Sequence, residues 1–180
     1  MIILGVDPGT LFTGYAVIGN EKGRMVLIEC DVIKNPSSDT LPVRLKNIYD
    51  SLVKVIDEHK PDEFAIETAY YGKNVQSTLK LGHARGVSIL AAVNKQIPTT
   101  EYSPREVKKS VVGIGSASKE QVRFMVCQIL KIKDKPKSLD ITDALAVALC
   151  HYNKVMGHKT TSQSWEDYVA RNPKKVIVKN

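Results

Sequence analysis

The order in which extended and helical patterns follow one another most limits the folds open to this chain. Three β-type runs come first, over residues 2–6, 13–18 and 24–33. The first run is wholly apolar, and Gly19 and Asn20, which separate the second from the third, predict a hairpin turn. Three consecutive strands joined by short turns predict an antiparallel meander.

Helical segments then alternate with two further strands. Apolar residues at three- and four-residue steps predict a helix over residues 41–59, and a compact strand follows over 64–66. A helix over 75–92 and a strand over 99–102 come next. Three more helices are expected to begin after Ser103 with Pro104 in the first turn, after Ser118 as far as Ile132, and at Ser138 or Leu139 as far as Asn153. This order predicts an α/β fold, a mixed five-stranded sheet flanked by helices.

The composition is typical of one globular domain with an anionic partner. The chain has 180 residues, 43% hydrophobic and 25% charged, which excludes a largely disordered chain and allows a substantial core. A net charge of +7 and a pI near 9.3 indicate an anionic partner, most commonly nucleic acid. Residues 1–156 are expected to form the domain. Residues 157–180 are expected to be a basic, loosely held tail, with only Trp165, Tyr168 and Val169 to anchor it.

The cysteines and the apolar runs indicate the cellular compartment in which the protein is expected. Cys30, Cys127 and Cys150 lie far apart and form no CxxC pair, which argues against a disulfide framework or a zinc site and suits a reducing cytosol. No apolar run approaches the roughly 18 residues that a membrane span needs. No basic leader precedes Asp7. We therefore expect a soluble, cytoplasmic protein with no membrane partner.

Four acidic residues stand directly against apolar sequence. Asp7 and Glu67 each follow a short core strand, while Asp140 and Asp143 lie three residues apart at the start of an apolar helix, on one face. Taken singly, the first two could be turn or cap residues, and the helix dipole could favour the pair. If the four carboxylates met, they would repel one another unless cations bound among them, and oxygen-only ligands indicate Mg²⁺ or Mn²⁺. Two such ions about 3.5–4 Å apart can activate a water and stabilise the leaving oxygen at a phosphodiester.

Positive charge is concentrated in two stretches. Residues 68–100 contain no Asp or Glu, and residues 105–137 contain nine Lys or Arg against three acids. Binding to a phosphate backbone requires such segregation, although a solvated basic face is the alternative. Lys80 and Arg85 fall in the first stretch. Lys119 follows a glycine-containing turn in the second stretch and is a candidate phosphate contact, although a plain interhelix turn fits as well.

Two tyrosines follow Glu67 on a glycine-containing loop. Tyr70 and Tyr71, with Lys73 and Asn74 beside them, could stack on bases or wedge into an opened strand. The alternative is that at least one tyrosine packs on the core.

Gly82 and Gly86 lie one helical turn apart in the segment 75–92. Another backbone could approach closely at such a pair of glycines. The contact could be internal packing or a helix–helix contact between two copies of the chain. His83, between them, is expected to be structural or to face solvent.

Five motifs, in this order, are together similar to the RuvC family of bacterial Holliday-junction resolvases. They are ILGVDPGT (3–10), FAIE (64–67), KLGHARG (80–86), VVGIGSA (111–117) and DITDALA (140–146). The resemblance covers roughly residues 1–152. It implies a ribonuclease-H-like fold and a homodimer that nicks two strands of a four-way DNA junction symmetrically, with Mg²⁺ or Mn²⁺, leaving 5′-phosphates.

The resemblance also assigns the acidic residues. By motif position, Asp7, Glu67, Asp140 and Asp143 resemble the family's catalytic, metal-binding acids.

Further residues match the family's DNA-binding and dimer positions. Lys108 and Lys119 resemble DNA-contacting lysines, and Tyr70 falls where the family carries an aromatic residue that inserts at the crossover. The segment 82–86 falls in the dimer interface of the family, which works with the RuvA–RuvB branch-migration complex. The chain departs from the family at His83, where Gln is common, and at Tyr70, where Phe is familiar.

Three alternatives stay open at this point. Residues 7–10 also resemble the first phosphate loop of actin- and Hsp70-like ATPases, but 180 residues leave no room for their second loop and second domain. A non-catalytic module that binds junctions is another alternative, although all four acids are present. The third is a related nuclease that processes RNA.

Overall fold

One five-stranded sheet forms the centre of the protein. The computed structural model describes residues 1–21, 24–68 and 75–156. Its strands are β1 (Ile2–Asp7), β2 (Phe12–Glu21), β3 (Arg24–Lys34), β4 (Glu63–Glu67) and β5 (Thr99–Tyr102). They lie in the order β3-β2-β1-β4-β5, antiparallel from β3 to β1 and parallel from β1 to β5. The predicted mixed sheet is confirmed.

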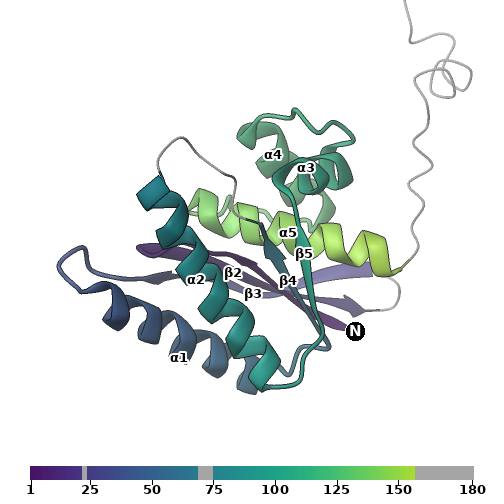
Figure 1. Cartoon of the computed structure of the whole chain (residues 1–180). Helices are drawn as coiled ribbons and strands as arrows, with labels where there is room; N and C mark the ends of the chain where they lie inside the picture. Colours follow the sequence, from purple (N-terminus) through teal and green to yellow (C-terminus); the bar gives the residue numbers. More distant parts are fainter. Residues whose placement is uncertain (22–23, 69–74, 157–180) are drawn as a thin grey trace, which may run out of the picture.

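Helices cover both faces of this sheet (Figure 1). They are α1 (Leu41–His59), α2 (Val75–Asn94), α3 (Pro104–Val112), α4 (Lys119–Ile129) and α5 (Leu139–Val155). Helices α1 and α2 pack together on one face, whereas α5 crosses β1 and β2 on the other face and carries α3 and α4. Each face has its own core, with Leu4 and Phe64 under α1 and α2, and Ile3 and Ala65 under α5. In the described ranges no helix is both long and apolar enough to cross a membrane.

The serine caps form as the sequence predicts. Ser103 and Ser118 each accept a hydrogen bond from the backbone three residues on, and each closes a reciprocal capping box with Glu106 or Gln121. Ser138 caps α5. Helix α4 ends three residues earlier than predicted. The chain leaves the helix after Leu130, and the residue that follows has a left-handed backbone with a φ of 54°.

The predicted turn at Gly19 and Asn20 is wrong. Both residues lie inside β2, where they pair with Val26 and Met25 of β3. The Asn20 side chain donates a hydrogen bond to the Tyr152 hydroxyl at 2.7 Å, which ties this end of β2 to α5. A tertiary contact therefore outweighs the turn preference of the Gly-Asn pair.

Candidate active site

Asp7 and Glu67 end two neighbouring parallel strands. Val6 of β1 pairs with Ile66 of β4, so the next residue of each strand lies at the same edge of the sheet. Side chains alternate along a strand, and Ala65, two residues before Glu67, belongs to the core under α5. The Glu67 carboxylate therefore points toward the face that α5 covers.

Two glycines let α5 approach the sheet at this edge. Gly14 pairs with Asp7, and a Cβ atom on Gly14 would lie 2.1 Å from the carbonyl oxygen of Asp140. A Cβ atom on Gly5 would lie 2.4 Å from the carbonyl oxygen of Ala144. Because a real side chain does not tolerate such contacts with backbone, only glycine permits the approach. The start of α5, with Asp140 and Asp143, is thereby held against the end of β1 and the start of β2.

The four carboxylates interact electrostatically, although they belong to two strands and one helix. Burial, reinforced by the charges of Asp143 and Asp140, raises the pKa of Asp7 from 3.8 to about 7. Burial, reinforced by Asp7 and Asp143, raises the pKa of Glu67 from 4.5 to about 8. The structure thus brings four acids from two strands and one helix into a single coupled group.

Two lysines lie beside the acids. Lys119 Nζ donates a hydrogen bond to Asp143 Oδ2 at 2.8 Å, and this bond raises the pKa of the lysine. The charge of Lys119 lowers the pKa of both Asp7 and Glu67, and that of Lys108 lowers the pKa of Glu67, but burial outweighs both. Positive charge from the protein therefore offsets the carboxylates only in part.

The donor set of this group fits a hard divalent cation. All four side chains offer carboxylate oxygens, the ligands that Mg²⁺ and Mn²⁺ prefer. The pKa values of Asp7 and Glu67 stay raised, first by burial and then by the neighbouring carboxylates, so the lysines compensate their charged forms only in part. The Ser138 hydroxyl donates a hydrogen bond to Asp140 Oδ2 and so fixes one of the four carboxylates.

The other predicted DNA contacts divide into two sets. Tyr70, Tyr71, Lys73 and Asn74 lie outside the described residues. Of the two predicted contacts on α2, Lys80 is exposed, whereas Arg85 donates to a carboxylate oxygen of Glu101, so part of its charge is already neutralised.

The glycine pair of α2 makes no close contact with the described part of the chain. A Cβ atom on Gly82 or Gly86 would meet nothing within 4 Å. Among the described residues, therefore, nothing packs closely on this pair, and the contact between two copies of the chain stays a prediction.

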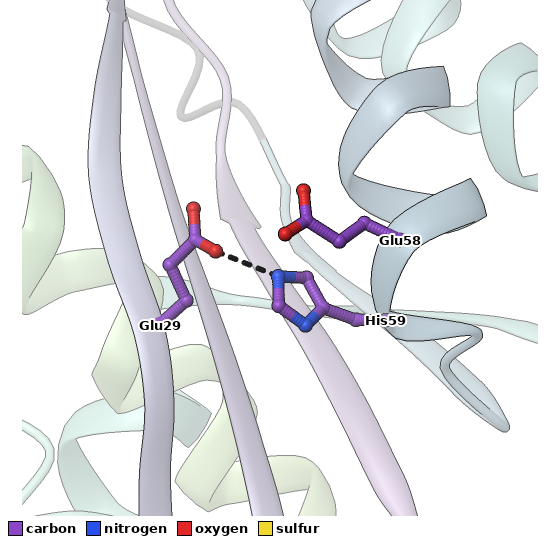
Figure 2. A group of neighbouring side chains, drawn as sticks. All are labelled: Glu29, Glu58 and His59. Carbon is purple, nitrogen blue, oxygen red and sulfur yellow. Dashed lines mark hydrogen bonds and ion pairs between the residues drawn. The ribbon is translucent and has the colours of Figure 1, made fainter.

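A second group of ionisable side chains was not predicted from the sequence. Glu29, Glu58 and His59 place their ligand atoms within 4.8 Å of one another, with Glu29 on β3 and the other two at the end of α1 (Figure 2). Glu29 accepts hydrogen bonds from the Tyr15 hydroxyl at 2.5 Å and from His59 Nε2 at 2.7 Å. Both oxygens of Glu29 are thus engaged, and the group links the edge strand to α1. A separation of 30 residues gives no sequence signal for it.

The sheet order and the carboxylates at its edge define a protein of the ribonuclease-H-like class. The family model described as "Crossover junction endodeoxyribonuclease RuvC" matches residues 3–151, most of the chain. The chain belongs to this RuvC family of crossover junction endodeoxyribonucleases. Membership favours a DNA nuclease over the ATPase, the binding module and the RNA-processing nuclease.

Relatives match over nearly their whole length. The crossover junction endodeoxyribonuclease RuvC of Salinibacter ruber is 48% identical over 98% of this chain and 99% of its own. That of Chloroherpeton thalassium is 47% identical over 98% of this chain and 100% of its own. The structure of Thermus thermophilus RuvC in complex with a Holliday junction substrate superposes with a TM-score of 0.82, at 30% identity, over 87% of this chain and 96% of that one.

Proposed function

We propose that this chain resolves four-way DNA junctions as a homodimer, by paired symmetric nicks that depend on Mg²⁺ or Mn²⁺. The observation that carries the proposal is the coupled group of four carboxylates at the ends of β1 and β4 and the start of α5, with two lysines beside it. The junction in the Thermus complex supports the substrate. The family resemblance adds the RuvA–RuvB branch-migration complex as a partner and the cytoplasm as the place of action.

The carboxylates would hold the metal ions, two per subunit. Bound there by Asp7, Glu67, Asp140 and Asp143, divalent ions lower the pKa of water and stabilise the leaving oxygen of a phosphodiester. The protein contributes rigid placement, because the acids sit on strand ends and on a core helix rather than on long loops. Ser138 restrains Asp140 through its hydrogen bond.

The lysines would offset charge on the scissile phosphate. Lys119 is bonded to Asp143 in the protein without DNA, yet its ammonium has three donors and its side chain is 60% exposed. It can therefore contact a phosphate oxygen and keep its carboxylate partner. Lys108 adds a second positive charge close to Glu67. Attack of water in line with the departing 3′-oxygen then leaves a 5′-phosphate.

An apolar face of α2 supports the homodimer. Its members recur at three- and four-residue steps and so share one side of the helix. They are Val75, Leu79, Gly82, Gly86, Leu90 and Val93. Val75 is 69% exposed and Leu79 is 59% exposed, which is costly for apolar side chains unless another surface covers them. A second copy bound by this face gives two equivalent sites related by a two-fold axis, as a symmetric junction requires.

The DNA surface would extend from the carboxylates to α2 and to the loop before it. Lys80 is exposed on α2, where it can contact a phosphate. Tyr70 and Tyr71 are proposed to stack on bases at the crossover, with Lys73 and Asn74 contacting the strand beside them.

The test compares a labelled four-way junction with a duplex of matched sequence, in Mg²⁺, in Mn²⁺ and in EDTA. Paired symmetric nicks on the junction alone, abolished by EDTA and by Asp7→Asn, are expected. Asp57→Asn is the matched control, because Asp57 is exposed and forms an ion pair with Lys95 on the opposite face of the sheet. Tight junction binding without cleavage in either metal, or equal cleavage of the duplex, would overturn the proposal.

A further inference from the structure

A cavity of about 1080 Å³ lies between the start of β3, the end of α4 and the last turns of α5. None of the four carboxylates lines it. It is therefore a feature of the molecule separate from the proposed active site.

The walls of this cavity are largely apolar. They include Met25 and Leu27 of β3, Ile129 at the end of α4 and Ile132 just after this helix. All four are partly buried and pack on the core under α5, yet the core covers only one side of each. Apolar surface left uncovered in a concave site favours an apolar occupant.

The rim of the cavity is positively charged. Arg24, Lys131 and Lys133 line it and are exposed, against one acid, Asp134. A complementary occupant therefore presents apolar side chains with negative charge directly beside them.

The chain itself contains such a segment. Trp165, Tyr168 and Val169 are apolar, and Glu166 and Asp167 between them are the only acids of residues 157–180. Aromatic side chains bury the most area for each residue that is ordered.

The segment is also within reach. The tail follows α5, whose Tyr152 and Asn153 line the cavity within one turn of Met156. Trp165 follows Met156 by nine positions. Nine extended residues span about 30 Å, more than the distance back along one helical turn requires.

We propose that residues 165–169 bind in this cavity of their own chain, with the aromatic side chains on the apolar walls and the two acids beside the basic rim. The short connection from α5 makes the binding intramolecular, at a high effective concentration.

The test uses Trp165, which is the only tryptophan of the chain. Its fluorescence in the full-length protein is expected at shorter wavelength than in the urea-unfolded chain, with less quenching by acrylamide. Reversing the rim with Lys131→Glu and Lys133→Glu should shift the emission to longer wavelength. Adding Glu166→Lys and Asp167→Lys should restore the original emission, because the charges are exchanged.

A matched control and three contrary outcomes complete the test. Val43→Glu, an equally drastic change at an exposed position on α1, should leave the emission unchanged, and circular dichroism should show that every variant is folded. Emission equal to that of the unfolded chain, or insensitive to the rim, would overturn the proposal. A blue shift that appears only at high protein concentration would also overturn it, since the segment would then bind another molecule.

Discussion

Asp7 and Glu67 are acidic residues held where their negative charge is costly. Burial and their neighbours raise both pKa values well above those of free side chains. The folded protein without metal therefore carries repulsion that a neutral side chain of the same shape would not. Stability given up in this way is common at sites that bind cations or substrates.

Replacing Asp7 with Asn should abolish junction cleavage and stabilise the metal-free protein. The amide removes a buried charge and its repulsion of Asp140 and Asp143. A gain of about 1–2 kcal/mol is expected, or roughly 2–4 °C in Tm for each kcal/mol. Thermal unfolding in EDTA measures it, and a lower Tm for the variant would contradict the pKa argument.

The stability of the metal-free protein should fall as the pH rises from about 4.5 to about 8. In this window the unfolded chain has released the protons of Asp7 and Glu67, whereas the folded chain retains them, because its pKa values are about 7 and about 8. The unfolded state binds fewer protons, so the free energy of unfolding decreases with pH. Urea unfolding in EDTA across this range checks the slope. Glu67→Gln should flatten it, and an unchanged slope in that variant would count against the assignment.

For single residues, the sequence identifies the candidate acidic side chains but not all of their contacts. Asp7 and Glu67 can be picked out because each follows a short apolar run, which marks the end of a core strand. Nothing local marks Glu29 and His59 as partners, because the contact depends on how α1 crosses the sheet. Whether a carboxylate is buried likewise depends on packing that no short pattern contains.

Among the elements, α5 joins the core to the candidate site. Every residue from Ala144 to Tyr152 is buried, and the two acids lie in the turns just before them. The contact of Gly14 with the Asp140 backbone sets how closely the helix approaches the sheet. The same helix thus contributes packing and two of the four carboxylates.

Gly14→Ala should therefore lower both stability and cleavage. The new methyl group collides with the backbone of α5, so the helix must move, at a cost of about 1–3 kcal/mol. Gly19→Ala is the matched control on the same strand, since the atom nearest to its methyl group is the terminal Cδ1 of the Ile28 side chain, at 2.9 Å, and not a backbone atom. Chemical unfolding and junction cleavage measure the effects. Equal effects of the two substitutions would refute the close approach as their cause.

Helix starts that depend on neighbouring residues in the sequence were predictable. An element whose conformation depends on a distant tertiary contact was not. Ser103 with Pro104, and Ser118 with Gln121, carry their capping chemistry in the sequence, and both helices begin there. Gly19 and Asn20 have turn chemistry of the same kind, but a contact with α5 holds them in a strand.

For the whole molecule, the proposed homodimer depends on the apolar face of α2. Gly86→Arg places a long charged side chain in open space on one chain, so the fold should be unaffected while the proposed dimer is lost. Val43→Arg, at an exposed apolar position on α1, is the control. Sedimentation should show monomers only for the first variant, and junction cleavage should lose its pairing of nicks. A Gly86→Arg protein that stays dimeric would exclude this face.

The burial of α5 determines how the protein loses its activity and its structure when it is heated. The helix that carries Asp140 and Asp143 cannot detach from the sheet without exposing the core under it. Asp140 and Asp143 therefore cannot leave the site by local unfolding at a temperature below that at which the rest of the domain unfolds. Loss of activity and loss of structure should follow one curve with temperature, so that an enzyme which is still folded is still able to cut.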